Sequence, residues 1–190
     1  MTFKTAFQHL IKDLLSNYQE GEAKSIAKII FEDEFKVFST ESQRIIKKEE
    51  ETKLATIKSR LLKNEPIQHI LGQADFYGLK FYVSPDVLIP RQETEELIYW
   101  VDESIKEFNS NHGNLIDIGT GSGCIGITLK KKLPNLEVWA IDISEKALRN
   151  ARTLGVRVMK AMRGAGVFCI EMFLLADDSV LVNEIAPRVH

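Results

Sequence analysis

The chain has 190 residues, a formal net charge of -2 at pH 7 and a hydrophobic share of 44%. This length allows one domain or two small ones, and the charge gives no reason to expect a nucleic-acid or membrane partner. No apolar run approaches membrane-spanning length, and no signal peptide is visible. Cys124 and Cys169 lack metal-ligand spacing, so we expect reduced thiols in a cytoplasmic protein.

Residues 1 to about 65 are predicted to form helices. Apolar side chains recur at helical spacing in the first segment, and a second apolar stripe follows Gly21, which is expected to close the first helix. Ser39 or Thr40 is the expected N-cap of a third helix. We therefore expect a small helical domain over residues 1–70, with a role in binding a macromolecule.

A β-hairpin linker is predicted over residues 71–92, after Pro66 ends the helical region. The aromatic run 76–83 is typical of a strand, and 84–86 has the composition of a turn. The apolar segment 87–89 is predicted to be the second strand. The functional interpretation is that the hairpin and the start of the next helix lie beside a nucleoside pocket and help to cover it. The alternative is that residues 90–97 merely cap that helix.

Three glycines at alternate positions follow the next predicted strand. After a helix over 93–108, we expect a strand over 115–118, the turn Gly119-Thr120-Gly121-Ser122-Gly123, a helix over 124–132 and a strand over 136–141. Such a turn is either structural or a site where a ligand approaches the backbone. Asp142, about 20 residues on, favours a nucleoside ligand, because an acid there accepts ribose hydroxyls. The spacing does not match a P-loop.

Several motifs in one order carry a resemblance to a known family. They are 68–72, 76–79, 87–95, 117–125 and 142–148. Over about the first 150 residues the chain resembles the HemK/PrmC family, the N5-glutamine methyltransferases of peptide chain release factors. The resemblance implies an α/β fold: an N-terminal helical domain, the hairpin linker and a truncated Rossmann-like class I methyltransferase sheet over 93–152. It also implies S-adenosylmethionine (SAM) as cofactor and a release factor as partner, bound by the N-terminal helices.

The same resemblance assigns the cofactor-binding residues. The predicted set is Asp117, Gly119, Thr120, Gly121, Ser122, Gly123 and Asp142, with Pro90, Arg91, Glu93 and Thr94 near the cofactor. The glycines would let the backbone pass close to the methionine part, and the helix N-terminus suits its carboxylate. Asp117 would orient the amino end, and Asp142 would accept both ribose hydroxyls.

No catalytic residue is predicted. The family holds the reacting amide with an Asn-Pro-Pro-Tyr motif, but the prolines of this chain stand singly, and Asn183 is followed by Glu184. The sequence therefore predicts a cofactor-binding half without its catalytic half, a truncated and inactive methyltransferase.

The last 40 residues differ in character. Strands are predicted over 167–175 and 179–185, joined by a two-residue turn at Asp177-Asp178, which places Glu171 opposite Glu184. Like charges in that position are destabilising, so either a divalent cation bridges them or both acids reach water at an exposed edge.

A second resemblance concerns this tail. The motifs 166–168, 171–173 and 181–188 are similar to the ATP-grasp enzyme 5-(carboxyamino)imidazole ribonucleotide synthase. The resemblance implies that Glu171 and Glu184 are metal ligands for Mg-ATP and that Arg188 lies near the phosphates. The tail 153–190 is thus predicted to be an ATP-grasp-like fragment, with the junction at about 150–158, where either family supplies a helix and a Leu-Gly-Val turn.

Other functions stay open at this point. The chain is alternatively a fragment of the ATP-grasp ligase, or a non-catalytic module that binds SAM or a release factor. A methyltransferase acting on RNA or DNA is a further alternative, which the near-neutral charge disfavours.

Overall fold

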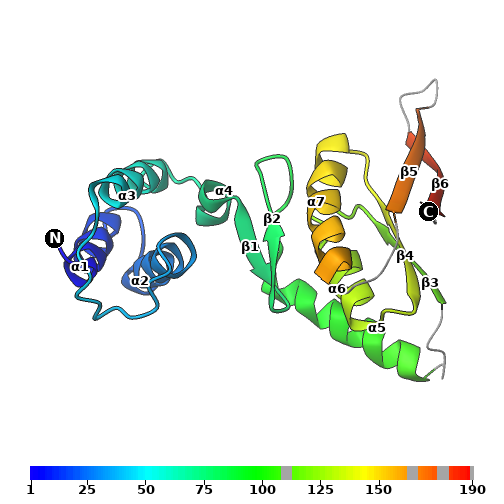
Figure 1. The fold of residues 1–190 in the computed structure, drawn as a ribbon, viewed down its shortest axis with the longest axis horizontal. Coiled ribbons are helices and arrows are strands. Elements are labelled where there is room, and N and C mark those ends of the chain that lie inside the picture. The colour runs from blue at the N-terminus through cyan, green and yellow to red at the C-terminus, as the bar shows by residue number, and fades with distance from the viewer. Residues whose placement is uncertain (108–112, 162–166, 175–179, 189–190) are drawn as a thin grey trace. The chain divides into compact units, whose positions relative to one another are not determined.

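The computed structural model describes residues 1–107, 113–161, 167–174 and 180–188, and the side chains of residues 1–106 and 113–153. The chain divides into two compact units, Met1–Leu71 and Gly72–His190. Figure 1 shows the elements of both.

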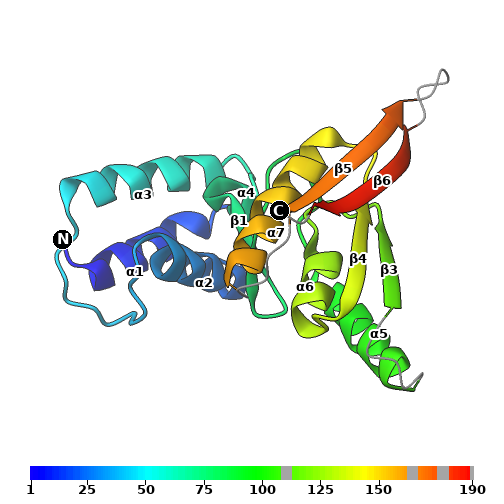
Figure 2. The same ribbon diagram turned by 45° about the vertical axis from the view of Figure 1, so that its right-hand side comes forward.

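The first unit is helical. Its elements are α1 (Phe3–Leu14), α2 (Glu20–Ile29), the π-helical turn Ile30–Glu34, α3 (Lys48–Leu61) and α4 (Ile67–Leu71). Helix α1 contacts both α2 and α3 (Figure 1; Figure 2). Gly21 lies in the first turn of α2 and does not close α1, and Pro66 precedes α4 and does not end the helical region. Proline is well tolerated there because the first N–H groups of a helix have no partner within it.

The core of this unit is rich in aromatic rings. Phe3, Leu14, Ile30 and Leu61 are each at most 1% exposed. Edge-to-face contacts join ring pairs whose centroids are 5.2–5.8 Å apart, within the set Phe3, Phe7, Phe31 and Phe35. Such packing adds to the free energy gained from burial alone.

The prediction of a helix capped at Ser39 or Thr40 is wrong. Helix α3 begins at Lys48, and residues 36–47 form a strap along the start of α1. The strap supplies carbonyl oxygens to the amides of Phe3 and Lys4, which have no acceptor within their own helix. The conformation of residues 36–47 is therefore determined by the unpaired amides at the start of α1. A capping pattern in the local sequence carries no information about these amides.

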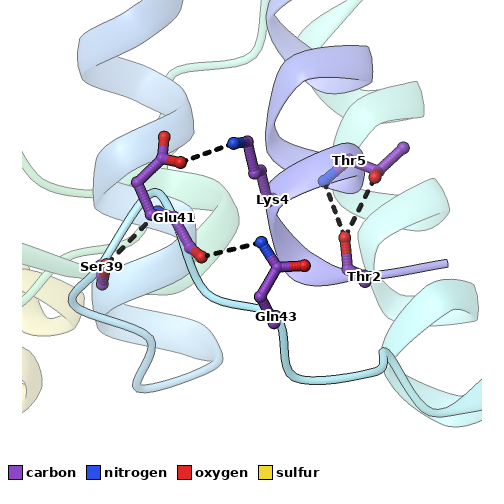
Figure 3. Close-up of polar contacts among 6 residues, drawn as sticks. All are labelled: Thr2, Lys4, Thr5, Ser39, Glu41 and Gln43. Atoms are coloured by element: carbon purple, nitrogen blue, oxygen red, sulfur yellow. Dashed lines mark hydrogen bonds and ion pairs between the residues drawn. The ribbon is translucent and has the colours of Figure 1, made fainter.

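Figure 3 shows how side chains hold this strap. The carboxylate of Glu41 lies 2.6 Å from the ammonium of Lys4, and the Glu41 amide donates to the hydroxyl of Ser39 at 3.3 Å. Gln43 donates to the carbonyl of Glu41 at 3.4 Å. Ser39 thus organises a turn within the strap.

The second unit begins with a β-hairpin whose strands differ from those predicted. They are β1 (Gln73–Phe76) and β2 (Leu79–Tyr82), paired antiparallel with Phe76 opposite Leu79. The predicted strand 76–83 is interrupted at Tyr77-Gly78, where both residues have positive φ. The predicted strand 87–89 is not a strand. The glycine inside the aromatic run marks the turn, not a strand interior.

A helix–strand alternation follows the hairpin. It comprises the 3-10 turn Gln92–Thr94, α5 (Glu95–Glu107), β3 (Gly113–Ile118), α6 (Cys124–Lys132), β4 (Leu136–Ile141) and α7 (Glu145–Ala161). Strands β3 and β4 are parallel, with Leu115 opposite Val138, and α6 connects them. The α/β class, with a small parallel sheet, is therefore confirmed, and α6 and β4 have the predicted bounds.

The junction with the tail is a continuous helix. Helix α7 runs through residues 150–158, so the Leu154-Gly155-Val156 segment is helical and not a turn. The tail forms β5 (Val167–Leu174) and β6 (Val180–Arg188), which pair antiparallel with Glu171 opposite Glu184.

The tail register shifts next to that pair. Met172 pairs with Val182, so Asn183 is an extra residue, and Leu174 pairs with Val180. The turn predicted at Asp177-Asp178 lies outside the described residues. No helix within the described residues is long and apolar enough to cross a membrane.

Candidate functional site

The glycine turn between β3 and α6 is held by backbone hydrogen bonds to the end of β4. Gly119, Gly121 and Gly123 have φ values of 74°, 55° and 79°, which glycine adopts with little cost. Figure 2 shows α6 lying against the β3–β4 pair directly after this turn. The amides of Gly119 and Thr120 donate to the carbonyl of Ile141 at the end of β4, at 2.7 and 2.9 Å. The turn is thereby tied to the carboxyl end of the neighbouring strand.

Asp117 supports the turn through hydrogen bonds. Its side chain is buried, and Oδ2 accepts from the Thr120 hydroxyl at 2.7 Å and from the Gly126 amide at 3.0 Å. Gly126 leaves room for this carboxylate, because a Cβ there would stand 3.2 Å from Oδ2. Orientation of a cofactor amino group by Asp117, directly or through water, stays a prediction.

Asp142 joins the glycine turn to the loop that follows β4. Oδ2 accepts from the Gly121 amide and Oδ1 from the Ser144 amide, each at 2.8 Å. Each carboxylate oxygen has two lone pairs, so one remains on each for a further donor. Two residues of the predicted cofactor-binding set, Gly121 and Asp142, are therefore in direct contact.

The three glycines do not serve one purpose. A Cβ on Gly123 would stand 2.8 Å from Ile127 Cδ1 and 2.9 Å from Ala151 Cβ, so this glycine permits α6 to pack against α7. A Cβ on Gly119 would meet nothing within 4 Å. Open space at Gly119 is what the close approach of a ligand requires, whereas Gly123 has a packing reason of its own.

Cys124 is a buried free thiol at the start of α6. Burial raises its pKa, the Ser122 hydrogen bond lowers it and the nearby Asp117 carboxylate raises it, with a net rise. The thiol is therefore neutral at physiological pH, in line with a packing role. Cys169 lies outside the residues whose side chains are described.

The segment before Pro90 is attached to α7. Ser84 Oγ accepts from Asn150 Nδ2 at 3.0 Å, and Asp86 lies 2.9 Å from Lys146. Val83 and Val87 are buried in one apolar cluster with Ala147, and Ile89 packs on its edge. Helix α7 begins three residues after Asp142, so these contacts bring the segment to the element that follows the turn.

The residues predicted near the cofactor come next in the chain. Arg91 and Glu93 are exposed, while Pro90 and Thr94 are half-buried. Their placement beside a cofactor stays a prediction.

One charged network was missed by the sequence analysis. Asp102 on α5 is 4% exposed and lies 3.0 Å from Lys106 and 3.2 Å from Lys132. Lys132 on α6 also reaches the Tyr77 hydroxyl at 3.2 Å, and Glu95 Oε1 accepts from the Tyr77 amide at 2.9 Å. The i,i+4 spacing of Asp102 and Lys106 was a usable signal, but nothing local indicates Lys132.

The metal prediction concerns the tail. The backbone register places Glu171 opposite Glu184 as expected, but their side chains lie outside those described. Among the described residues, no cluster of three or more acids, histidines or cysteines could hold a metal ion. Metal binding by these two glutamates stays a prediction.

Comparison with known proteins gives named relatives for much of the chain. A release factor glutamine methyltransferase of Bacteroides thetaiotaomicron is 58% identical over 99 residues, which are 52% of this chain and 34% of the relative. One of Flavobacterium psychrophilum is 51% identical over 98 residues, which are 51% and 34%. One of Streptococcus pneumoniae is 36% identical over 157 residues, which are 80% and 54%. The chain thus spans a third to about half the length of these relatives.

The longest of these matches includes the glycine turn. A contiguous match over 80% of 190 residues contains about residue 40 to about residue 150 wherever it begins. In addition, the model of the ATP-grasp domain matches residues 128–190. The front of the chain is therefore homologous to release factor glutamine methyltransferases, and the tail resembles an ATP-grasp domain; both resemblances expected from the sequence are confirmed at this level.

Proposed function

We propose that residues 72–153 bind SAM as the cofactor-binding half of a release factor glutamine methyltransferase. The observation that carries the proposal is the turn held by Asp142, because it stands in the segment homologous to enzymes of that name. Bound SAM supplies a methyl group from its sulfonium. The chain's own part is to hold the cofactor in one orientation, on which methyl transfer depends.

The groups around the turn fit a nucleoside. Asp142 is half-buried, and each of its oxygens keeps a lone pair for a ribose hydroxyl. Ile143 is 80% exposed and offers an apolar surface to a purine ring. The open side of Gly119 leaves room for the methionine part, while Thr120 and Ser122 are buried and shape the turn. The start of α6 suits the cofactor carboxylate.

Isothermal titration with SAM tests the proposal directly. We expect saturable binding by the full chain, and about tenfold or greater weakening in Asp142→Ala, since hydrogen bonds from two hydroxyls to a charged acceptor are lost. Asp142→Asn separates charge from shape, and a thermal melt of each variant separates ligand loss from unfolding. Glu137→Ala, at an exposed acid on β4, is the matched control. No heat and no thermal shift at millimolar SAM would contradict the proposal.

Residues 1–190 contain no Asn-Pro-Pro-Tyr motif, so the proposal assigns no catalytic residue within them. We expect SAM binding without methylation of a release factor by this chain alone. A mass-spectrometric assay for methylated glutamine measures this, and turnover would show that other side chains of the chain can hold the amide.

The proposed partner of the helical unit is a release factor. Its strap exposes Phe38 and Ile45, at 74% and 71%, on a backbone that is anchored to α1. Exposed apolar side chains on a fixed backbone suit a protein partner. A pull-down of release factor by the full chain should weaken in Phe38→Ala, and unchanged capture would contradict this surface.

A second candidate function concerns the tail. The ATP-grasp match over 128–190 and the pairing of Glu171 with Glu184 favour a remnant Mg-ATP site of the kind found in the ribonucleotide synthase. Two carboxylates alone bind magnesium poorly, because it keeps most of its waters unless phosphates join the site. We expect no magnesium-dependent heat of ATP binding, and a heat lost in Glu184→Gln would establish this candidate.

A further inference from the structure

The turn of the β1–β2 hairpin has an unusual residue at its first position. Tyr77 and Gly78 form the two-residue turn, with φ values of 48° and 70°. Glycine adopts such values readily, whereas a bulky residue adopts them only with backbone strain. A tyrosine at this position needs support from its surroundings.

That support comes from both helices beneath the hairpin. The Tyr77 amide donates to Glu95 Oε1 at 2.9 Å, and Glu95 is the first residue of α5. Lys132 on α6 lies 3.2 Å from the Tyr77 hydroxyl and 5.4 Å from the ring centroid. Asp102 holds Lys132 in turn. The tip of the hairpin is therefore attached to α5 by its backbone and to α6 by its side chain.

The far end of the same segment is attached to α7. Asp86 pairs with Lys146, Ser84 accepts from Asn150, and Ile89 packs beside Val87 and Ala147. Only residues 90–94 separate Ile89 from Glu95. This short stretch, which includes Pro90 and Arg91, thus runs between two anchored points.

We propose that Glu95 is a positioning residue, which holds the hairpin turn against the start of α5 and thereby fixes residues 90–94. The inference rests on the proposed function in so far as these residues lie beside SAM. Its carboxylate serves as a hydrogen-bond acceptor for a strained turn, and no charge on Glu95 is required for that purpose. A neutral acceptor of the same length should therefore be able to take the place of the Glu95 carboxylate.

The test uses the full chain with three variants. Glu95→Ala removes the acceptor, Glu95→Gln keeps an acceptor oxygen without the charge, and Glu96→Ala removes a neighbouring exposed acid from the same helix turn. Amide hydrogen exchange at Tyr77 and tryptic cleavage after the exposed Arg91 report on the segment without SAM. Titration with SAM reports on the site.

We expect exchange and cleavage to rise in Glu95→Ala, with SAM affinity about fivefold weaker, as for the loss of one ordinary hydrogen bond. Glu95→Gln should restore both, and Glu96→Ala should behave as the parent. Unchanged exchange in Glu95→Ala would overturn the inference whether or not the parent binds SAM. Raised exchange with unchanged SAM affinity would overturn the link to the site. Absence of SAM binding in the parent would overturn the proposed function and that link together, while exchange and cleavage still decide whether Glu95 holds the turn.

Discussion

Aromatic rings hold the first unit together, whereas carboxylates hold the glycine turn of the second. Phe3, Phe31 and Phe35 pack edge to face among buried aliphatic side chains. At the turn, Asp117 and Asp142 accept hydrogen bonds from backbone amides. Apolar packing has no direction and tolerates no cavity, while each carboxylate hydrogen bond fixes one amide. Substitutions in the aromatic core should therefore lower the free energy of unfolding. Substitutions of the carboxylates at the glycine turn should weaken ligand binding before they affect stability.

The largest expected effect is a cavity in the helical core. Leu14→Ala should lower the free energy of unfolding by about 2–5 kcal/mol, because the leucine is fully buried and its space cannot close completely. Leu15→Ala is the matched control, since Leu15 is 49% exposed and its loss should cost about 0.5 kcal/mol or less. Urea unfolding followed by circular dichroism measures both. Equal losses at the two positions would contradict the assigned core.

The next effect separates two glycines of one turn. Gly123→Ala should cost about 2–4 kcal/mol, because the new Cβ collides with Ile127 and Ala151 at a positive φ. Gly119→Ala adds only the positive φ, at about 1–2 kcal/mol, since its Cβ meets open space. Thermal melts give the order of stability of the two variants. Relative to the stability that each variant loses, SAM titration should show the greater loss of affinity in Gly119→Ala. The reverse order would contradict the two roles.

A pH effect of intermediate size comes from Asp102. Burial alone would raise its pKa, but hydrogen bonds from Lys106 and Lys132 outweigh it and hold the pKa below the ordinary value. A depressed folded pKa means that its contribution is present above the unfolded pKa of about 3.9 and is lost as pH falls through the folded value.

Asp102→Asn should therefore destabilise the chain at pH 7 by about 1–2 kcal/mol, with a smaller difference from the parent below about pH 3. Urea unfolding at several pH values checks this. Glu103→Gln, at a more exposed acid that also pairs with Lys106, is the control. A difference independent of pH would exclude this ionic contribution.

The sequence predicted the parts of the fold that depend on local pattern. Helix α6 and strand β4 have their predicted bounds because glycines and a proline-containing turn delimit them. These are cases in which neighbours in sequence carry the whole signal.

The features that the sequence did not predict depend on tertiary contacts. Residues 36–47 form a strap because the first amides of α1 need acceptors, and Tyr77 enters a tight turn because Glu95 and Lys132 hold it. Neither set of partners is adjacent in sequence. The tail shows the same limit, since the pairing of Glu171 with Glu184 was predicted but the extra residue Asn183 was not.

The smallest expected effect concerns a carboxylate of the helical unit that accepts a hydrogen bond from a backbone amide, as Asp142 does at the glycine turn. Glu50 accepts from the Lys47 amide at 2.8 Å, and this hydrogen bond lowers the pKa of Glu50. Glu50→Ala should cost about 0.5–1 kcal/mol, as for loss of a helix cap, with no change in SAM affinity. Glu49→Ala, an exposed neighbour in the same turn of α3, should cost less, and a thermal melt compares them. If Glu50→Ala instead unfolded the unit, polar contacts and not the aromatic core would govern it, because a single exposed-edge cap is otherwise too weak to outweigh buried phenylalanines.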